Sequence, residues 1–145
     1  MNVLKIGGLA VVAALTAVPA VPASAQELPQ CYGQRIAREQ IRTNDVIGTY
    51  LDVFYTASNA TVCAYVTTTA QSQYTRKRML VALRQCAAAG SGCTTWTSVR
   101  TDNEAARSAR LAVKRTKPCF QVFGATQWGD HEWGQRTTPA LCPQG

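Results

Sequence analysis

The chain has 145 residues, with 15 Lys and Arg against eight Asp and Glu, and a formal net charge of +7. A single histidine and the absence of any Cys-x-x-Cys pair argue against a zinc site. No Gly-x-Ser-x-Gly, phosphate loop or paired-carboxylate spacing occurs, so we expect no metal, no cofactor and no catalytic residue.

Residues 1–25 have the pattern of a secretory signal peptide. Lys5 precedes an apolar run over 6–18, and a small-x-small triplet then predicts cleavage before Gln26. An uncleaved membrane anchor is the alternative, but two prolines interrupt the segment. We therefore expect the mature chain, 26–145, to be one secreted or cell-surface domain without a transmembrane segment.

Mature composition predicts disulfides and an anionic partner. An even number of cysteines in an exported chain indicates disulfides, and six allow fifteen pairings. Loss of Lys5 leaves a formal charge of +6, which favours acidic cell-wall glycopolymers or nucleic acid as partners. Simple solubility of a basic protein is the alternative. No feature predicts a protein partner.

Taken in chain order, the first mature segment is the least clear. Ile36, Ala37 and Ile41 suit one or two helical turns, with a short strand or an irregular lead-in as alternatives. The clearest pattern follows, in which residues 46–55 and 61–67 are β-branched and aromatic and flank a polar turn. These two segments predict a hairpin, with alternate side chains directed to the core.

The remaining segments predict further short strands. We expect strands over residues 79–84, 94–99, 108–115 and 119–123, and a turn or single helical turn over 101–106. Beyond Gly124 we expect irregular chain. Six or seven short strands at hairpin spacing predict an all-β antiparallel sandwich or barrel.

Cysteine positions suggest three bridges. Cys86 and Cys93 flank a Gly-Ser-Gly reversal and predict a bridged hairpin tip. Cys63 and Cys119 both lie inside predicted strands, so we expect them to pair across the core. The remaining pair, Cys31 and Cys142, would then join the two mature ends.

The spacing of these segments resembles that of the small spore-associated proteins of filamentous actinobacteria. The resemblance rests on Cys31-x-Gly, on Ile47-Gly, on Cys63-Ala-x-Val-Thr, on the apolar strand 79–84 and on Cys119-Phe before a closing cysteine. The Cys86–Cys93 pair and the Arg/Ala-rich segment 104–112 depart from the pattern. The resemblance implies a location at the spore or cell surface, with no established biochemical role.

Basic residues supply the candidate binding site. If the strands that carry them are neighbours, one positive face would hold an anionic cell-wall or spore-surface polymer. Tyr74 and Trp96 would add stacking contacts. The candidates are Arg76, Lys77, Arg78, Arg84, Arg110 and Lys114. A solvated sheet face is the alternative interpretation.

Two other functions stay open. His131, flanked by Asp130 and Glu132 and near Arg136, would centre a small hydrolase or ribonuclease if the loop covered a pocket. The 86–93 loop would suit a secreted inhibitor that displays a rigid tip. Because consecutive residues rarely converge on one point, we expect a non-catalytic, surface-associated binding protein.

Overall fold

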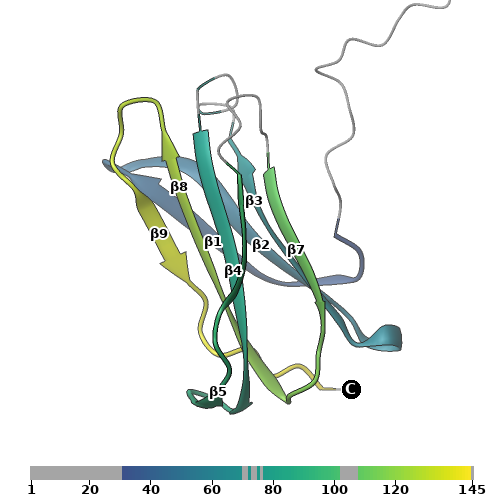
Figure 1. Cartoon of the computed structure of the whole chain (residues 1–145). Helices are drawn as coiled ribbons and strands as arrows, with labels where there is room; N and C mark the ends of the chain where they lie inside the picture. The colour runs from purple at the N-terminus through teal and green to yellow at the C-terminus, as the bar shows by residue number, and fades with distance from the viewer. Residues whose placement is uncertain (1–30, 70–71, 73–74, 76, 102–107, 145) are drawn as a thin grey trace, which may run out of the picture.

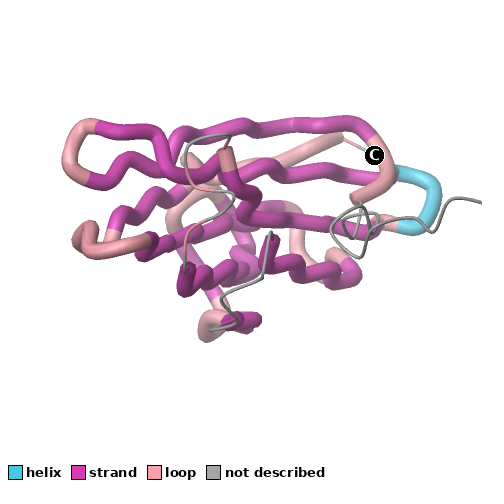
Figure 2. Tube along the Cα trace, turned by 90° about the horizontal axis from the view of Figure 1, so that it is seen from above, coloured by secondary structure: helices cyan, strands magenta, loops and turns pink. Residues whose placement is uncertain are grey.

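The protein is a two-layer β-sandwich in the computed structural model, which describes residues 31–69, 72, 75, 77–101 and 108–144 (Figure 1, Figure 2). The predicted signal segment lies outside this range, and no helix among the described residues is long and apolar enough to span a membrane. The elements are β1 (Gln34–Thr43), β2 (Val46–Thr56), the 3-10 turn η2 (Ala57–Asn59), β3 (Thr61–Thr68), β4 (Lys77–Ala88), β5 (Ser91–Cys93), β6 (Thr97–Thr101), β7 (Ser108–Lys114), β8 (Cys119–Trp128) and β9 (Gly134–Thr137).

Both sheets are antiparallel. The first sheet has the order β1-β2-β3-β7, and the second has the order β5-β4-β8-β9, with β6 also paired to β4. The chain enters the second sheet after β3, returns to the first at β7 and crosses again at β8. Segments distant in sequence therefore become neighbours, as β3 pairs with β7 and β4 pairs with β8.

The core lies between the two sheets and follows the period-two alternation of the strands. In β2, the predicted inward positions Leu51, Val53 and Tyr55 are buried. Val62, Ala64 and Val66 of β3 meet them from the same sheet, which confirms the predicted hairpin. The second sheet contributes Met79, Val81, Leu83, Phe120 and Val122.

Of the alternatives kept near Ile36, the short strand is correct and the helical turns are wrong, because the segment is the edge strand β1. Its register against β2 shifts between Arg35 and Ala37, which indicates a β-bulge. The extra residue breaks the period-two alternation, so the apolar spacing mimics a helix. Ile41 is fully buried in the core.

The irregular chain expected beyond Gly124 is also wrong, since β8 continues to Trp128 and β9 follows. Gly124 does not end the strand. Its missing side chain leaves room for the core, since a Cβ there would lie 3.0 Å from Ile41 Cδ1 and Val66 Cγ2. The predicted strand over 94–99 begins later, at Thr97, and the turn expected over 101–106 lies, apart from Thr101 at the end of β6, outside the described residues.

All six cysteines form disulfides, but only one predicted pairing is correct. Cys86–Cys93 is confirmed, and the other bridges are Cys31–Cys63 and Cys119–Cys142. The expected 63–119 and 31–142 pairs are wrong because of strand parity. Val62 and Phe120 point into the core, so the adjacent Cys63 and Cys119 point outward on opposite sides of the sandwich.

Candidate functional site

A group of aromatic and basic side chains lies on the outer face of the second sheet. In β4, Met79, Val81 and Leu83 point into the core, so the alternate residues face outward. Directly paired residues on neighbouring strands share a face of the sheet. Leu80 of β4 is paired with Arg100 of β6 on one side and with Ala125 of β8 on the other, so all three residues lie on the outer face. We call this surface the Trp/Arg face; it comprises Leu80, Arg84, Trp96, Arg100, Phe123 and Trp133.

Contacts between these side chains join strands that are distant in sequence. The guanidinium carbon of Arg84 lies 4.9 Å from the Trp96 ring centroid, and Trp96 packs edge-on against Phe123 at 6.2 Å. Arg100, on β6, lies 5.9 Å from the ring of Trp133, which immediately precedes β9. Cations at such distances are attracted to the ring faces. The side chains therefore form two clusters on one face of the sheet, Arg84 with Trp96 and Phe123, and Arg100 with Trp133.

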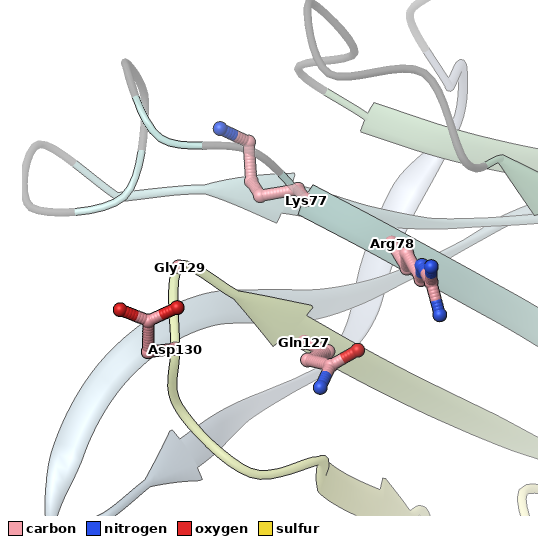
Figure 3. Close-up of a pocket in the computed structure, with 5 residues that line it drawn as sticks. All are labelled: Lys77, Arg78, Gln127, Gly129 and Asp130. Atoms are coloured by element: carbon pink, nitrogen blue, oxygen red, sulfur yellow. The ribbon is translucent and has the colours of Figure 1, made fainter.

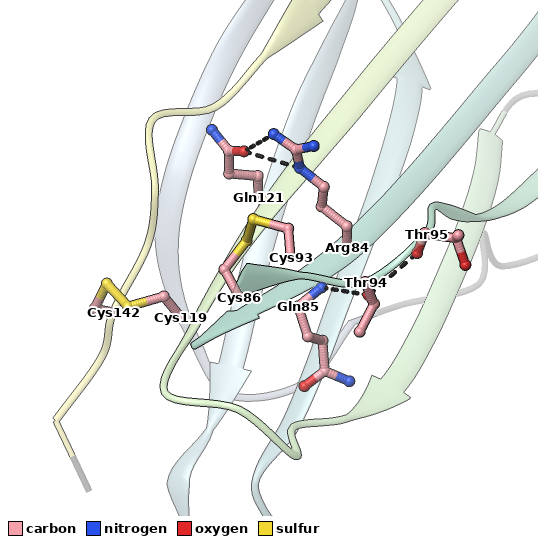
Figure 4. The surroundings of a disulfide bond; sticks show 9 residues. All are labelled: Arg84, Gln85, Cys86, Cys93, Thr94, Thr95, Cys119, Gln121 and Cys142. Atoms are coloured by element: carbon pink, nitrogen blue, oxygen red, sulfur yellow. Dashed lines mark hydrogen bonds between the residues drawn. A yellow bond between two sulfur atoms is a disulfide. The ribbon is translucent and has the colours of Figure 1, made fainter. Parts of the chain in front are cut away.

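These side chains are held in place while the rings stay accessible. Arg84 donates to Gln121 Oε1 from both Nε (3.0 Å) and an Nη (2.7 Å), which orients its guanidinium plane (Figure 4). Trp96 is 41% exposed and Trp133 is 44% exposed, high values for the largest side chains. Ordered, exposed aromatic groups lose little entropy on binding, so such a surface is suited to recognition.

Both ends of the Trp/Arg face have distinct chemistry. At one end the Cys86–Cys93 and Cys119–Cys142 bridges lie side by side, because Cys86 and Cys119 are register partners (Figure 4). At the other end a pocket of about 340 Å³ is lined by Lys77, Arg78, Gln127, Gly129 and Asp130 (Figure 3). Among the described outward positions of β4, β6, β8 and β9, no Asp or Glu occurs, so these strands contribute only positive charge; the exposed carboxylates Asp130 and Glu132 lie in the turn before Trp133.

The predicted anion-binding residues do not form one face. Arg78 and Arg84 lie on the outer side of the second sheet, whereas Arg110 and Lys114 are exposed on the outer side of the first. The single positive face is therefore wrong, since strands β4 and β7 belong to different layers. Arg76 lies outside the described residues.

Lys77 is also wrong as a surface cation. It is 1% exposed, and its ammonium donates to the backbone carbonyl oxygens of Ser72 and Thr75. Lys77 is the first residue of β4 and points inward like Met79, because alternate residues of a strand face the same side of the sheet. This alternation, rather than the charge of the side chain, decides where Lys77 lies. The side chain tethers the segment before β4.

His131 lies in the turn between β8 and β9. Its ring packs 4.1 Å from the Trp128 ring, and the side-chain amide nitrogen of Asn44 lies 3.3 Å from Nδ1. Within the described chain, neither flanking carboxylate forms an ion pair or hydrogen bond with it. Arg136 instead pairs with Glu39 Oε2 at 3.0 Å, which joins β9 to β1.

The 86–93 loop is an exposed tip closed by its disulfide. Gly90 and Gly92 both have positive φ, which allows the tight reversal. The residues from Ala87 to Gly92 are all exposed, and all are small. The tip displays no large side chain that could fill a partner's pocket.

The sequence pointed to Trp96 and Arg84 but missed Arg100, Phe123 and Trp133. Tyr74, the other predicted stacking residue, lies outside the described residues. A usable signal was present, because Phe123 alternates with the core residues Phe120 and Val122 and so had to face outward or lie at an edge. Strand neighbours, which only the fold supplies, were needed to bring it to Trp96.

Comparison with protein-family models, curated proteins and solved structures finds no significant match to this chain.

Proposed function

We propose that this protein is an exported, non-catalytic binding protein that holds an anionic glycan polymer on the Trp/Arg face. The observation that carries the proposal is the arrangement of Arg84 over Trp96 and Arg100 over Trp133, exposed on one sheet face. Three disulfides are compatible with an extracellular protein. The resemblance to spore-associated proteins suggests the spore or cell envelope as its location.

The chemistry of the face suits an acidic sugar chain. A guanidinium group binds a carboxylate through two parallel hydrogen bonds, so arginine is preferred over lysine for such groups. The flat indole rings of Trp96 and Trp133 offer apolar surface to the C–H faces of sugar rings. Successive residues of a polymer would thus meet alternating cations and rings across the strands.

Binding to polygalacturonate, measured by calorimetry at low salt, tests the proposal. Trp96→Ala and Arg100→Gln should each weaken binding about tenfold, equivalent to about 1.4 kcal/mol. Lys117→Gln is the control, because Lys117 lies in the connection between β7 and β8, outside the face, and its loss should leave the affinity unchanged. In 0.5 M salt, where the Debye length is about 4 Å, the affinity should fall steeply.

Two results would overturn the proposal. Tighter binding to single-stranded RNA than to polygalacturonate at equal charge would indicate a nucleic-acid-binding protein, which also uses basic and stacking residues. Release of reducing ends from the glycan that is lost in His131→Ala would show a hydrolase.

A further inference from the structure

The outer face of the first sheet carries a second group of basic and aromatic side chains. The register aligns Arg38, Asp52, Tyr65 and Arg110 in one row across all four strands, β1, β2, β3 and β7. The row is outward because its neighbours Leu51, Ala64 and Leu111 lie in the core. We call this surface the Arg/Tyr face; it comprises Arg35, Arg38, Tyr50, Phe54, Tyr65, Arg110 and Lys114.

The aromatic groups of this face are stacked and ordered. The guanidinium carbon of Arg38 lies 4.1 Å from the Tyr50 ring centroid. Phe54 and Tyr65 stack with centroids 5.7 Å apart and planes within 10°. This repeats on the first sheet the pairing of cations with rings that characterises the Trp/Arg face.

The one carboxylate of this row lies beneath the cations. Arg35 and Arg38 each place a nitrogen 3.7 Å from Asp52 Oδ1, and their side chains remain 49% and 45% exposed against 5% for Asp52. Asp52 Oδ1 is buried and has no hydrogen-bond partner. A ligand therefore meets the arginines rather than the carboxylate, and the exposed groups of the face are cationic.

We propose that the protein is bivalent and cross-links anionic glycan chains, with one chain on the Trp/Arg face and a second on the Arg/Tyr face. The two faces are the opposite outer surfaces of the sandwich, so one short segment of polymer cannot contact both (Figure 1, Figure 2). The inference rests on the proposed function and adds a second site. Two sites on one rigid body join polymer chains into a network.

The number of short oligogalacturonate molecules bound by each protein tests the inference. Calorimetry should give two per wild-type protein. The double variant Arg110→Gln with Lys114→Gln should bind one, because both side chains are exposed on β7 and neither pairs with Asp52. With the long polymer, wild type should produce light scattering that rises and falls with the mixing ratio, and the double variant should lower the peak at least fivefold.

A control removes a cation elsewhere. Lys117→Gln loses a cation from the connection between β7 and β8, outside both faces, and should retain two sites and full scattering. One site in wild type, lost in Trp96→Ala, would leave the proposed function intact and refute bivalency. Two sites that persist in the Arg110/Lys114 variant would refute this location, and no binding at all would refute both proposals.

Discussion

The disulfide Cys119–Cys142 ties the C-terminal segment to β8, and its removal gives the sharpest test of the fold. The segment also pairs through its backbone, since Phe120 and Leu141 exchange two hydrogen bonds of 2.9 and 2.8 Å. Replacing both cysteines by alanine should therefore destabilise the protein without abolishing the fold. The bridge spans a sequence separation of 23, which corresponds to about 3.4 kcal/mol of loop-closure entropy.

The neighbouring bridge is a matched control on the same sheet face. Cys86–Cys93 has a sequence separation of 7, which corresponds to about 2.4 kcal/mol. For a domain of about 115 residues, 1 kcal/mol changes Tm by about 4 °C. The Cys119→Ala with Cys142→Ala variant should thus lose about 14 °C, and the Cys86→Ala with Cys93→Ala variant about 10 °C.

Scanning calorimetry under non-reducing conditions measures both values. If the Tm of the Cys86/Cys93 variant fell by as much as that of the Cys119/Cys142 variant, or by more, the loop-closure reasoning would be refuted. Peptide mapping of the unreduced wild type checks the disulfide pairing. Recovery of a Cys63–Cys119 peptide would refute the conclusion that these two cysteines point outward on opposite sides of the sandwich.

Two further perturbations test buried contacts. Burial raises the pKa of Asp52, although Arg38 and Arg35 act in the opposite direction. The protonated carboxyl therefore stabilises the folded protein below the ordinary pKa of about 3.9, and this stabilisation is lost as pH rises through the pKa of Asp52 in the folded state. Asp52→Asn should therefore raise Tm by about 4 °C at pH 7, consistent with about 1 kcal/mol for an unsatisfied buried group, and leave it unchanged near pH 3; a rise confined to acid pH would contradict this sign. Gly48→Ala should lower Tm by about 4–12 °C, because its Cβ would clash with the indole ring of Trp128 and such overpacking costs about 1–3 kcal/mol. Partial recovery in the double variant with Trp128→Phe would identify the clash, whereas an unchanged Tm for Gly48→Ala alone would refute it.

The limits of the sequence are clearest at the cysteines. Alternation with Val62 already showed that Cys63 faces the opposite way from the core, and the same holds for Cys119 beside Phe120. What alternation cannot show is which segments cover the outer faces. Only the fold brings Cys31, before β1, to Cys63, so parity excludes a pairing but does not select one.

The candidate site shows the same division. Trp96 and Arg84 could be recognised as exposed groups on adjacent predicted strands, yet nothing local indicated that Arg100 would reach Trp133 across the sheet. Conversely, Arg110 and Lys114 were correctly predicted as outward and wrongly joined to the same face as Arg84. Charge and parity are local properties, whereas the layer to which a strand belongs is not.

By itself, the sequence determined the all-β class, most strand positions, the inward and outward residues of β2, β3 and β7, and the Cys86–Cys93 bridge. Each depends on side chains within a few residues, through β propensity, period-two alternation or a short turn. Tertiary structure alone decided the two-sheet order, the long-range bridges, the strand identity of β1 and β9, and the assembly of the Trp/Arg face. These depend on hydrogen-bonded pairing between distant segments, such as β3 with β7, whose energy is set by contacts that no local pattern encodes.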